Sequence, residues 1–224
     1  MAVETREVSR FDRLRFRGPG TVKLMQGDTE SLTIHAPAYM MRNIESEVRD
    51  GKLHLGYVSP RITSMRAFKE VISYQLVMKD IRGIVMSGSG KITAPDIDND
   101  AIGLQLSGSG SIVFEHLTAD RFAVEIGGSG RVTVQGDVEA QHVVMSGSGQ
   151  YEAEKLVSDF AHVKMSGSGN AHVSVSDDLN VEISGSGRVS YAGYPDISKR
   201  ISGSGALLRR RRDKRPVNRG ENNG

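Results

Sequence analysis

In the last two thirds of the chain, apolar and polar residues alternate in a fixed phase around one repeated word. The word is MSGSG at 86–90, and it returns as LSGSG, IGGSG, MSGSG twice and ISGSG twice. Counted from the residue after the apolar letter, the copies begin at 87, 107, 127, 146, 166, 184 and 202. Spacings of 18 to 20 residues are typical of solenoids, in which each repeat buries its apolar side against its neighbours. We therefore expect one coil of chain per word.

The apolar residues form columns when the seven copies are aligned. The residue directly before the word is always apolar, and so is the residue two places earlier, except in the last copy, where it is Lys199. The second residue after the word continues the phase: Ile92, Ile112, Val132, Tyr151, Ala171, Val189 and Leu207. Period-two alternation rich in β-branched residues predicts strands with one buried face. The predicted fold class is all-β, a single-stranded parallel β-helix of about seven coils of 18–20 residues.

The repeated word is interpreted as a corner between two strands. Glycine permits backbone angles and close approaches that side chains forbid, and the serine hydroxyls are expected to bond to the backbone or to a serine one coil away. The predicted turn residues are Gly88, Gly90, Gly108, Gly110, Gly128, Gly130, Gly147, Gly149, Gly167, Gly169, Gly185, Gly187, Gly203 and Gly205. A phosphate-binding loop is the alternative, but such a loop occurs once, leads into a helix and usually carries a following Lys with Ser or Thr. Seven copies between strands favour the corner.

The first 86 residues lack the word but contain related patterns. LRFRGPGTVKL at 14–24 has the layout of LQLSGSGSIVF and indicates a degenerate first coil. PAYMMRNIESEV, at 37–48, is a candidate short helix. Further strand candidates are Leu32 with Ile34, Leu53 with Leu55, and Ile72 with Tyr74 and Leu76. This less regular β portion is expected to continue the solenoid and to cover its open end, because bare strand edges attract other chains.

Charge divides the chain more sharply than the net value of +2 suggests. Residues 1–208 carry 22 basic and 25 acidic residues, whereas 209–224 carry seven basic and two acidic ones. We predict one continuous domain, with 1–86 irregular and 87–208 regular, followed by a disordered basic tail over 209–224. The tail is a candidate contact for anionic membrane or nucleic acid. Its basic cluster consists of Arg209, Arg210, Arg211, Arg212, Lys214 and Arg215.

The composition gives limited information about the cellular location of the protein. The chain has no cysteine, so it has no disulfide framework, zinc–thiolate site or cysteine nucleophile. No stretch approaches the roughly 20 apolar residues that span a bilayer. The opening MAVETREVSRFDRLRFRG is too charged for a secretory signal. The protein is expected either to stay in the cytoplasm or to have an upstream signal in the native gene.

Few residues suggest chemistry. His142 and His162 fall in one outward column of adjacent coils, about 5 Å apart, and two histidines at that distance are weak candidates for a metal site. The alternative is a surface ladder of like side chains. His35, His54, His116 and His172 have no evident partner. Asp96, Asp98 and Asp100 lack the glycine and glutamate of a calcium loop and are read as a solvated return segment. No catalytic residue, cofactor or small-molecule substrate is predicted.

The combination of FDRLRFRGPGTVKLMQGD, VRDGKLHLGY, the serial SGSG words and the closing ISGSGRVSYAGYPDISKRISGSG resembles the head GIN domain family, also called "putative auto-transporter adhesin". The resemblance covers roughly residues 8–208. It implies a secreted or envelope-attached bacterial β-helix protein whose molecular role is unsettled.

Three functions from different classes follow from these observations. The favoured hypothesis is a non-enzymatic structural or adhesive module of the cell envelope that presents a rigid surface to proteins or glycans. The second is a cytoplasmic scaffold that self-assembles and contacts anionic membrane or nucleic acid through its tail. The third is a glycan-processing enzyme, which requires carboxylates aligned on one face, and the outward columns do not show them.

Overall fold

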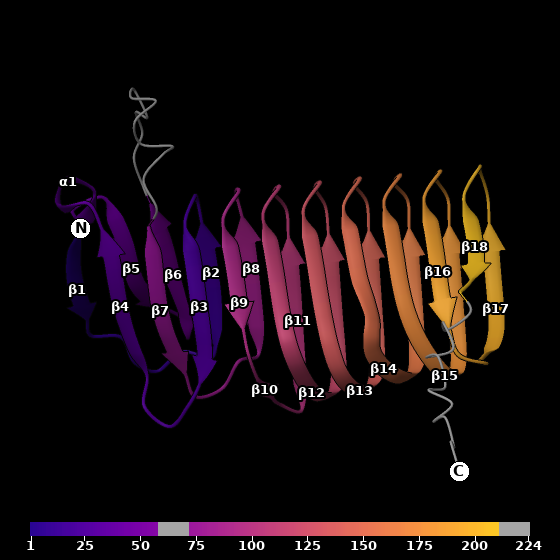
Figure 1. Ribbon diagram of the computed structural model, residues 1–224, viewed down its shortest axis with the longest axis horizontal. Coiled ribbons are helices and arrows are strands. Elements are labelled where there is room, and N and C mark those ends of the chain that lie inside the picture. Colours follow the sequence, from indigo (N-terminus) through magenta and orange to yellow (C-terminus); the bar gives the residue numbers. More distant parts are fainter. Residues whose placement is uncertain (58–71, 211–224) are drawn as a thin grey trace, which may run out of the picture.

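The computed structural model describes residues 1–57 and 72–210, and it confirms the predicted all-β solenoid (Figure 1). Strands stack in parallel along one long axis, and loops of three or four residues join them along one edge. In the repeat region the strands are β8 (Gly83–Ser87), β9 (Lys91–Ala94), β10 (Ile97–Asp98), β11 (Ala101–Leu106), β12 (Ser111–Ile126), β13 (Arg131–Met145), β14 (Gln150–Met165), β15 (Asn170–Ile183), β16 (Arg188–Ala192), β17 (Asp196–Ile201) and β18 (Ala206–Arg209). Within the described residues, no helix has the length and apolarity needed to span a bilayer.

Each coil has two faces, separated by the word. Segments that precede the word form what we call the pre-word face, and segments that follow it form the post-word face. The predicted register is confirmed on the pre-word face, where Val124, Val143, Val163 and Val181 pair in succession. All four are buried, so the columns between the faces form one continuous core.

In the regular coils, the segment that leads from the post-word face of one coil to the pre-word face of the next also forms a strand. β12 runs without interruption from Ser111 to Ile126, and its middle pairs Leu117 with Gly136 and Thr118 with Asp137 in β13. These segments contain turn-favouring residues such as Gly136 and Asp137, but each segment has the next coil as a template for hydrogen bonding. Stacking therefore overrides local propensity in this part of the coil.

Close backbone approach explains the glycines of the word. A Cβ on Gly167 would overlap the carbonyl oxygen of Gly147, and one on Gly147 would overlap that of Gly128. Of the fourteen glycines, only Gly88 and Gly203 have a positive φ. Contact between coils, more than an unusual backbone angle, thus excludes side chains at these positions.

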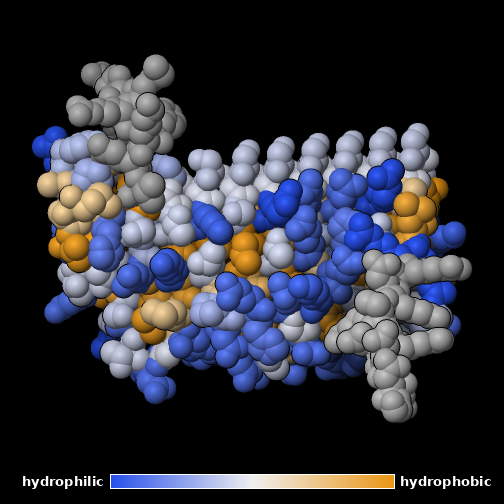
Figure 2. Space-filling view, in the orientation of Figure 1, coloured by the Kyte–Doolittle hydropathy of each residue, from blue (hydrophilic) through white to orange (hydrophobic). Residues whose placement is uncertain are grey.

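The backbone continues the hydrogen-bond ladder around the corner. The amides of Ser107, Ser109 and Ser111 donate to the carbonyls of Met86, Gly88 and Gly90 at 3.0 Å. The Ser107 hydroxyl donates to the Met86 carbonyl at 3.4 Å. Among the described residues, the serine hydroxyls of the words form none of the expected bonds to a serine of the next coil. Figure 2 shows the corners as a row of pale side chains along one edge of the molecule.

At the N-terminal end the order of strands in space differs from their order in the chain. β2 (Arg13–Arg17) and β3 (Thr21–Gln26) make the predicted degenerate coil, which stacks on β8 and β9. On its other side lie β6 (Lys52–Tyr57) and β7 (Ser73–Met78), which come later in the chain. The degenerate coil therefore comes before β6 and β7 in the sequence but after them in the stack of parallel coils.

Antiparallel strands close this end. β4 (Ser31–Ala36) pairs with β7, β1 (Ala2–Arg6) pairs with β4, and β5 (Ile44–Arg49) pairs with β6. The helix α1 (Ala38–Met41) links the two faces. The predicted helix over 37–48 was wrong beyond residue 41, because Ile44–Arg49 pairs with β6 instead.

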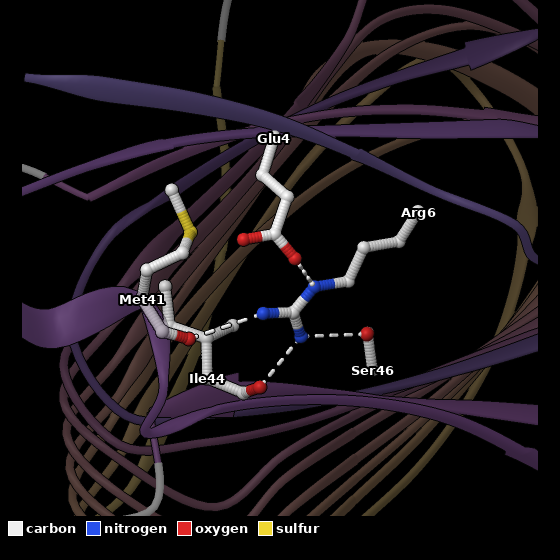
Figure 3. A network of polar contacts seen from close by, with 5 residues as sticks. All are labelled: Glu4, Arg6, Met41, Ile44 and Ser46. Atoms are coloured by element: carbon white, nitrogen blue, oxygen red, sulfur yellow. Dashed lines mark hydrogen bonds and ion pairs between the residues drawn. The ribbon is translucent and has the colours of Figure 1, made fainter. Parts of the chain in front are cut away.

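One arginine holds the closing elements together (Figure 3). Arg6 donates to the Ile44 carbonyl at 2.6 Å, to the Ser46 hydroxyl at 2.8 Å and to the Met41 carbonyl at 3.0 Å. Its Nε contacts the Glu4 carboxylate at 2.7 Å. A single guanidinium thus ties β1 to α1 and β5, since it offers several donors in a fixed geometry.

The corner packing gives a prediction about stability. Gly167→Val should lower the free energy of unfolding by several kcal/mol, because the new side chain would enter space held by the Gly147 carbonyl. The matched control is Gly127→Ser, which converts the third word to the common form. A Cβ there meets only the Ser146 hydroxyl, at 3.7 Å, so the change should stay within about 0.5 kcal/mol. Gly203→Val, in the terminal coil, should cost less than Gly167→Val. Equal urea midpoints for all three variants would contradict this account.

Candidate functional site

A groove of about 440 Å³ crosses the middle of the pre-word face, over β12 to β15. We call it the histidine groove. It is lined by Arg121, Phe122, Ala123, Ala140, Gln141, His142, Phe160, Ala161, His162, Asp178 and Asn180. Two of these residues, His142 and His162, were candidates from the sequence. The charged and aromatic residues beside them were not.

Side-chain size along two rows creates the depression. In one row Arg121, Ala140, Phe160 and Asp178 pair in succession across the four strands. The short Ala140 leaves a gap between the arginine and the aromatic ring. Phe160 is 41% exposed, which is unusual for a large apolar residue on a sheet face, so its ring is available for contact.

The parallel row contains the histidine pair. His142 lies directly opposite His162, as the register predicted, and their ring centroids are 4.9 Å apart. The rings meet edge to face, at 87°. The Nε2 atom of His162 is buried without a hydrogen-bond partner and lies 3.8 Å from the Glu182 carboxylate. This separation permits electrostatic attraction only when the imidazole is protonated.

The pair lacks the ligands of a metal centre. No three His, Cys, Asp or Glu side chains in residues 1–57 and 72–210 are grouped so that they hold an ion together. Two imidazoles leave a tetrahedral shell mostly to water, so weak zinc binding stays a prediction.

The other histidines and the acidic segment lie apart from the groove. His35, His54, His116 and His172 are on β4, β6, β12 and the post-word part of β15. The segment with Asp96, Asp98 and Asp100 is held through its backbone, because the Gln26 side chain accepts from the Asp98 amide at 2.9 Å and donates to its carbonyl at 2.9 Å. This contact gives the segment a structural role.

A buried polar chain supports the floor of the groove. The Tyr151 hydroxyl donates to Gln141 at 2.9 Å, Gln141 donates to the Ser158 hydroxyl at 2.7 Å, and Ser158 donates to the Ser174 carbonyl at 3.1 Å. Gln141 is 2% exposed and occupies a column that is otherwise apolar. Because every member has a partner, the network fixes β13 to β15 rigidly beneath the surface row.

A second depression of about 330 Å³ extends the groove toward the N-terminal end. It shares Ala123 and His142 with the histidine groove, and Gly83 and Gly103 line it between them and Arg13. We call the two together the trough. A Cβ on Gly103 would meet nothing nearer than the Arg82 carbonyl, at 3.9 Å. Packing therefore does not require glycine at position 103. The missing side chain leaves the floor of the trough open.

The trough is lined by three basic and two acidic side chains. Lys52 and Arg13 line one end, Arg121 lines the middle, and Asp178 and Asn180 line the other end. Acidic partners are partly engaged, since Glu125 accepts from Gln105 at 3.2 Å.

The first residues of the basic cluster belong to the last coil. β18 extends to Arg209, whose guanidinium lies 3.9 Å from the centre of the Tyr194 ring. The Arg210 amide donates to the Tyr191 carbonyl at 2.8 Å, and its side chain contacts Glu154 at 3.0 Å. Arg211, Arg212, Lys214 and Arg215 lie outside the described residues, and charge-driven binding by the tail stays a prediction.

The histidine pair yields a prediction about pH. Burial, then the neighbouring His162, then Lys164 lower the pKa of His142 below the ordinary 6.5. The folded protein therefore favours the neutral ring, and the stability that depends on it is present above about pH 6.5 and lost as pH falls through the folded pKa. In ring-proton NMR titrations, His162→Gln should raise the His142 pKa while leaving it below 6.5, because burial is the larger cause. Unshifted curves in both proteins would refute the environment described here.

Comparison with known proteins agrees with this architecture. A crystal structure of a "putative adhesin" from Bacteroides fragilis matches with a TM-score of 0.84 and 21% identity, over 93% of this chain and 95% of that one. A "putative adhesin" from Parabacteroides merdae matches at 0.74 and 18%, over 94% and 96%. A "Putative lipid binding protein" from Parabacteroides distasonis matches at 0.74 and 21%, over 94% and 96%. At these identities the likeness establishes the fold alone.

A search of the curated proteins found no match. The family model described as "Putative auto-transporter adhesin, head GIN domain" matches residues 10–195, which span most of the solenoid from β2 to β16. Six of the seven words, the degenerate first coil and the closing Tyr194–Pro195 pair fall within that range. The chain therefore belongs to the head GIN domain family.

Proposed function

We propose that this protein is a non-enzymatic binding module of the bacterial cell envelope, and that its trough holds an extended glycan with acidic groups. The observation that carries the proposal is the shape of the trough, a shallow and elongated depression with an open Gly83–Gly103 floor. A polymer chain lies along such a surface, whereas a compact small molecule favours an enclosed pocket.

The side chains at the trough suit sugars. The exposed Phe160 ring offers an apolar platform for the C–H face of a sugar ring. Arg121 and Asn180 supply hydrogen-bond donors, and Arg121 adds charge that favours a carboxylate. The stacked strands and the Gln141 network hold these groups in place, which reduces the entropy cost of binding.

The surface gives no support to glycan cleavage. Glycoside hydrolysis needs two carboxyl groups facing each other across the scissile bond. Glu125 is engaged by Gln105, and Glu182 lies beside His162. Asp178 stands at one end of the groove without a second carboxylate among the lining residues. Binding is therefore the activity that we propose for this face.

The family description and the "putative adhesin" structures support the envelope location. In a bacterium that produces the protein, an impermeant reagent should label it on intact cells while a cytoplasmic marker stays unlabelled. Labelling that occurs only after lysis would favour the cytoplasmic scaffold.

Filling the trough tests its role directly. Gly103→Tyr should abolish retention on immobilised uronate-containing oligosaccharides, because the ring would occupy the floor, yet the fold should persist since the position has room for a side chain. Phe160→Ala should weaken binding by about threefold to tenfold, as expected for the loss of an aromatic contact of about 1 kcal/mol.

The matched control is Gly127→Tyr, which places the same side chain at a corner with space around it. It should bind as the unmodified protein does. Neutral oligosaccharides and phospholipid vesicles complete the panel, the latter because one structural relative is named a "Putative lipid binding protein". Retention on vesicles alone, or equal binding by Gly103→Tyr and Gly127→Tyr, would overturn the glycan proposal.

A further inference from the structure

The two ends of the solenoid are finished differently. At the N-terminal end, β1 and β5 lie antiparallel to their neighbours and Arg6 ties them to α1 (Figure 3). At the C-terminal end, β17 pairs only with β15 and β18 pairs only with β16 among the described residues. Each of these strands thus has one edge of backbone donors and acceptors without a described strand partner.

The C-terminal end also exposes apolar side chains. All six residues of β17 are exposed, with Ile197 at 42% and Ile201 at 38%. Leu208, on β18, is 47% exposed. Figure 2 shows hydrophobic colour at the end of the molecule where Figure 1 labels β18. Exposed apolar residues beside an unpaired edge are typical of a surface that associates.

We infer that two copies of this chain join through β17, in an antiparallel pair related by a twofold axis. The arrangement continues the sheet from one molecule into the next with the strand spacing already used inside each coil. This inference is independent of the glycan proposal, since it concerns the end of the solenoid and not the trough.

The charges of β17 are complementary to themselves. Asp196, Ser198 and Arg200 alternate with Ile197 and Lys199, so they point to the same side of the strand. When Ser198 lies opposite the same serine of the second copy, Asp196 lies opposite Arg200 on both sides of the axis. Two equivalent ion pairs then form, and outward residues face outward residues throughout.

Other partners for this edge fit less well. At the N-terminal end, β1 and β5 also have one described strand partner each, but Arg49 already engages Glu45 and Glu47 there, so a head-to-tail contact offers Arg200 fewer free carboxylates. Residues 211–224 contain five basic residues and a single strongly apolar one, Val217. Their sequence lacks the period-two alternation of apolar residues that is typical of a strand.

A twofold axis perpendicular to the sheet places both pre-word faces on one side of the dimer. The N-terminal caps then lie at the two far ends, and the two troughs face the same direction. A dimer of this form presents two binding surfaces to one polymer or one cell surface, which increases avidity without a new contact.

Charge reversal tests the inference on the full chain. By sedimentation over a wide range of concentrations, the unmodified protein should be a concentration-dependent dimer. Asp196→Arg and Arg200→Asp should each raise the dissociation constant at least tenfold, because each places like charges opposite one another. The double variant should restore dimerisation. Lys91→Glu, on the post-word face, is the control and should leave the dimer unchanged.

The substituted side chains are exposed, so unchanged thermal unfolding should accompany the monomeric state. An unmodified protein that stays monomeric, single variants that still dimerise, or a double variant that stays monomeric would each overturn the inference. Monomeric variants that still bind uronate-containing oligosaccharides would show that the trough acts independently of the dimer.

Discussion

The contact between glycine backbones at the corner is the constraint on which the rest of the fold depends. At Gly147 and Gly167, the space that a Cβ would need is occupied by the carbonyl of the previous coil. This close approach fixes where each coil begins relative to its neighbour, so a slip of one residue would place side chains inside backbone and would turn the apolar columns outward. The glycine contacts are therefore sufficient to set the register of the strands.

The fixed register determines which side chains lie next to each other on the surface. Residues that are 18 to 20 positions apart in the chain become neighbours on adjacent strands. A small side chain in one coil therefore leaves a gap between the larger side chains of the coils on either side. The trough arises in this way, from Gly103, Ala123 and Ala140 lying beside Arg13, Arg121 and Phe160. Its rigidity comes from the sheet beneath it and from the buried Gln141 network.

The sequence was most informative where the word repeats. Alternation around SGSG predicted the coils, the buried columns and the opposition of His142 and His162, because each depends on period and phase alone. It could not predict that β6 and β7 lie outside β2 and β3, since neither strand order nor a helix that stops at Met41 follows from a local pattern. The trough was missed because its members are individually ordinary, and only stacking shows that Phe160 is exposed beside Ala140. Arg209 and Arg210 were assigned to the tail because charge outweighed their contacts with Tyr194 and Glu154.

The inverted order of the first coils restricts how the chain reaches its native state. From β8 onward, each coil pairs with the coil directly before it in the chain. Leu14, however, packs between Leu53 on one side and Ile84 on the other. The N-terminal coil therefore waits for about 70 further residues before both its neighbours exist, and closing that loop has an entropic cost that the local coils avoid. We therefore expect the N-terminal end to form more slowly than the regular coils, whose strand pairs lie only 18 to 20 residues apart in the chain.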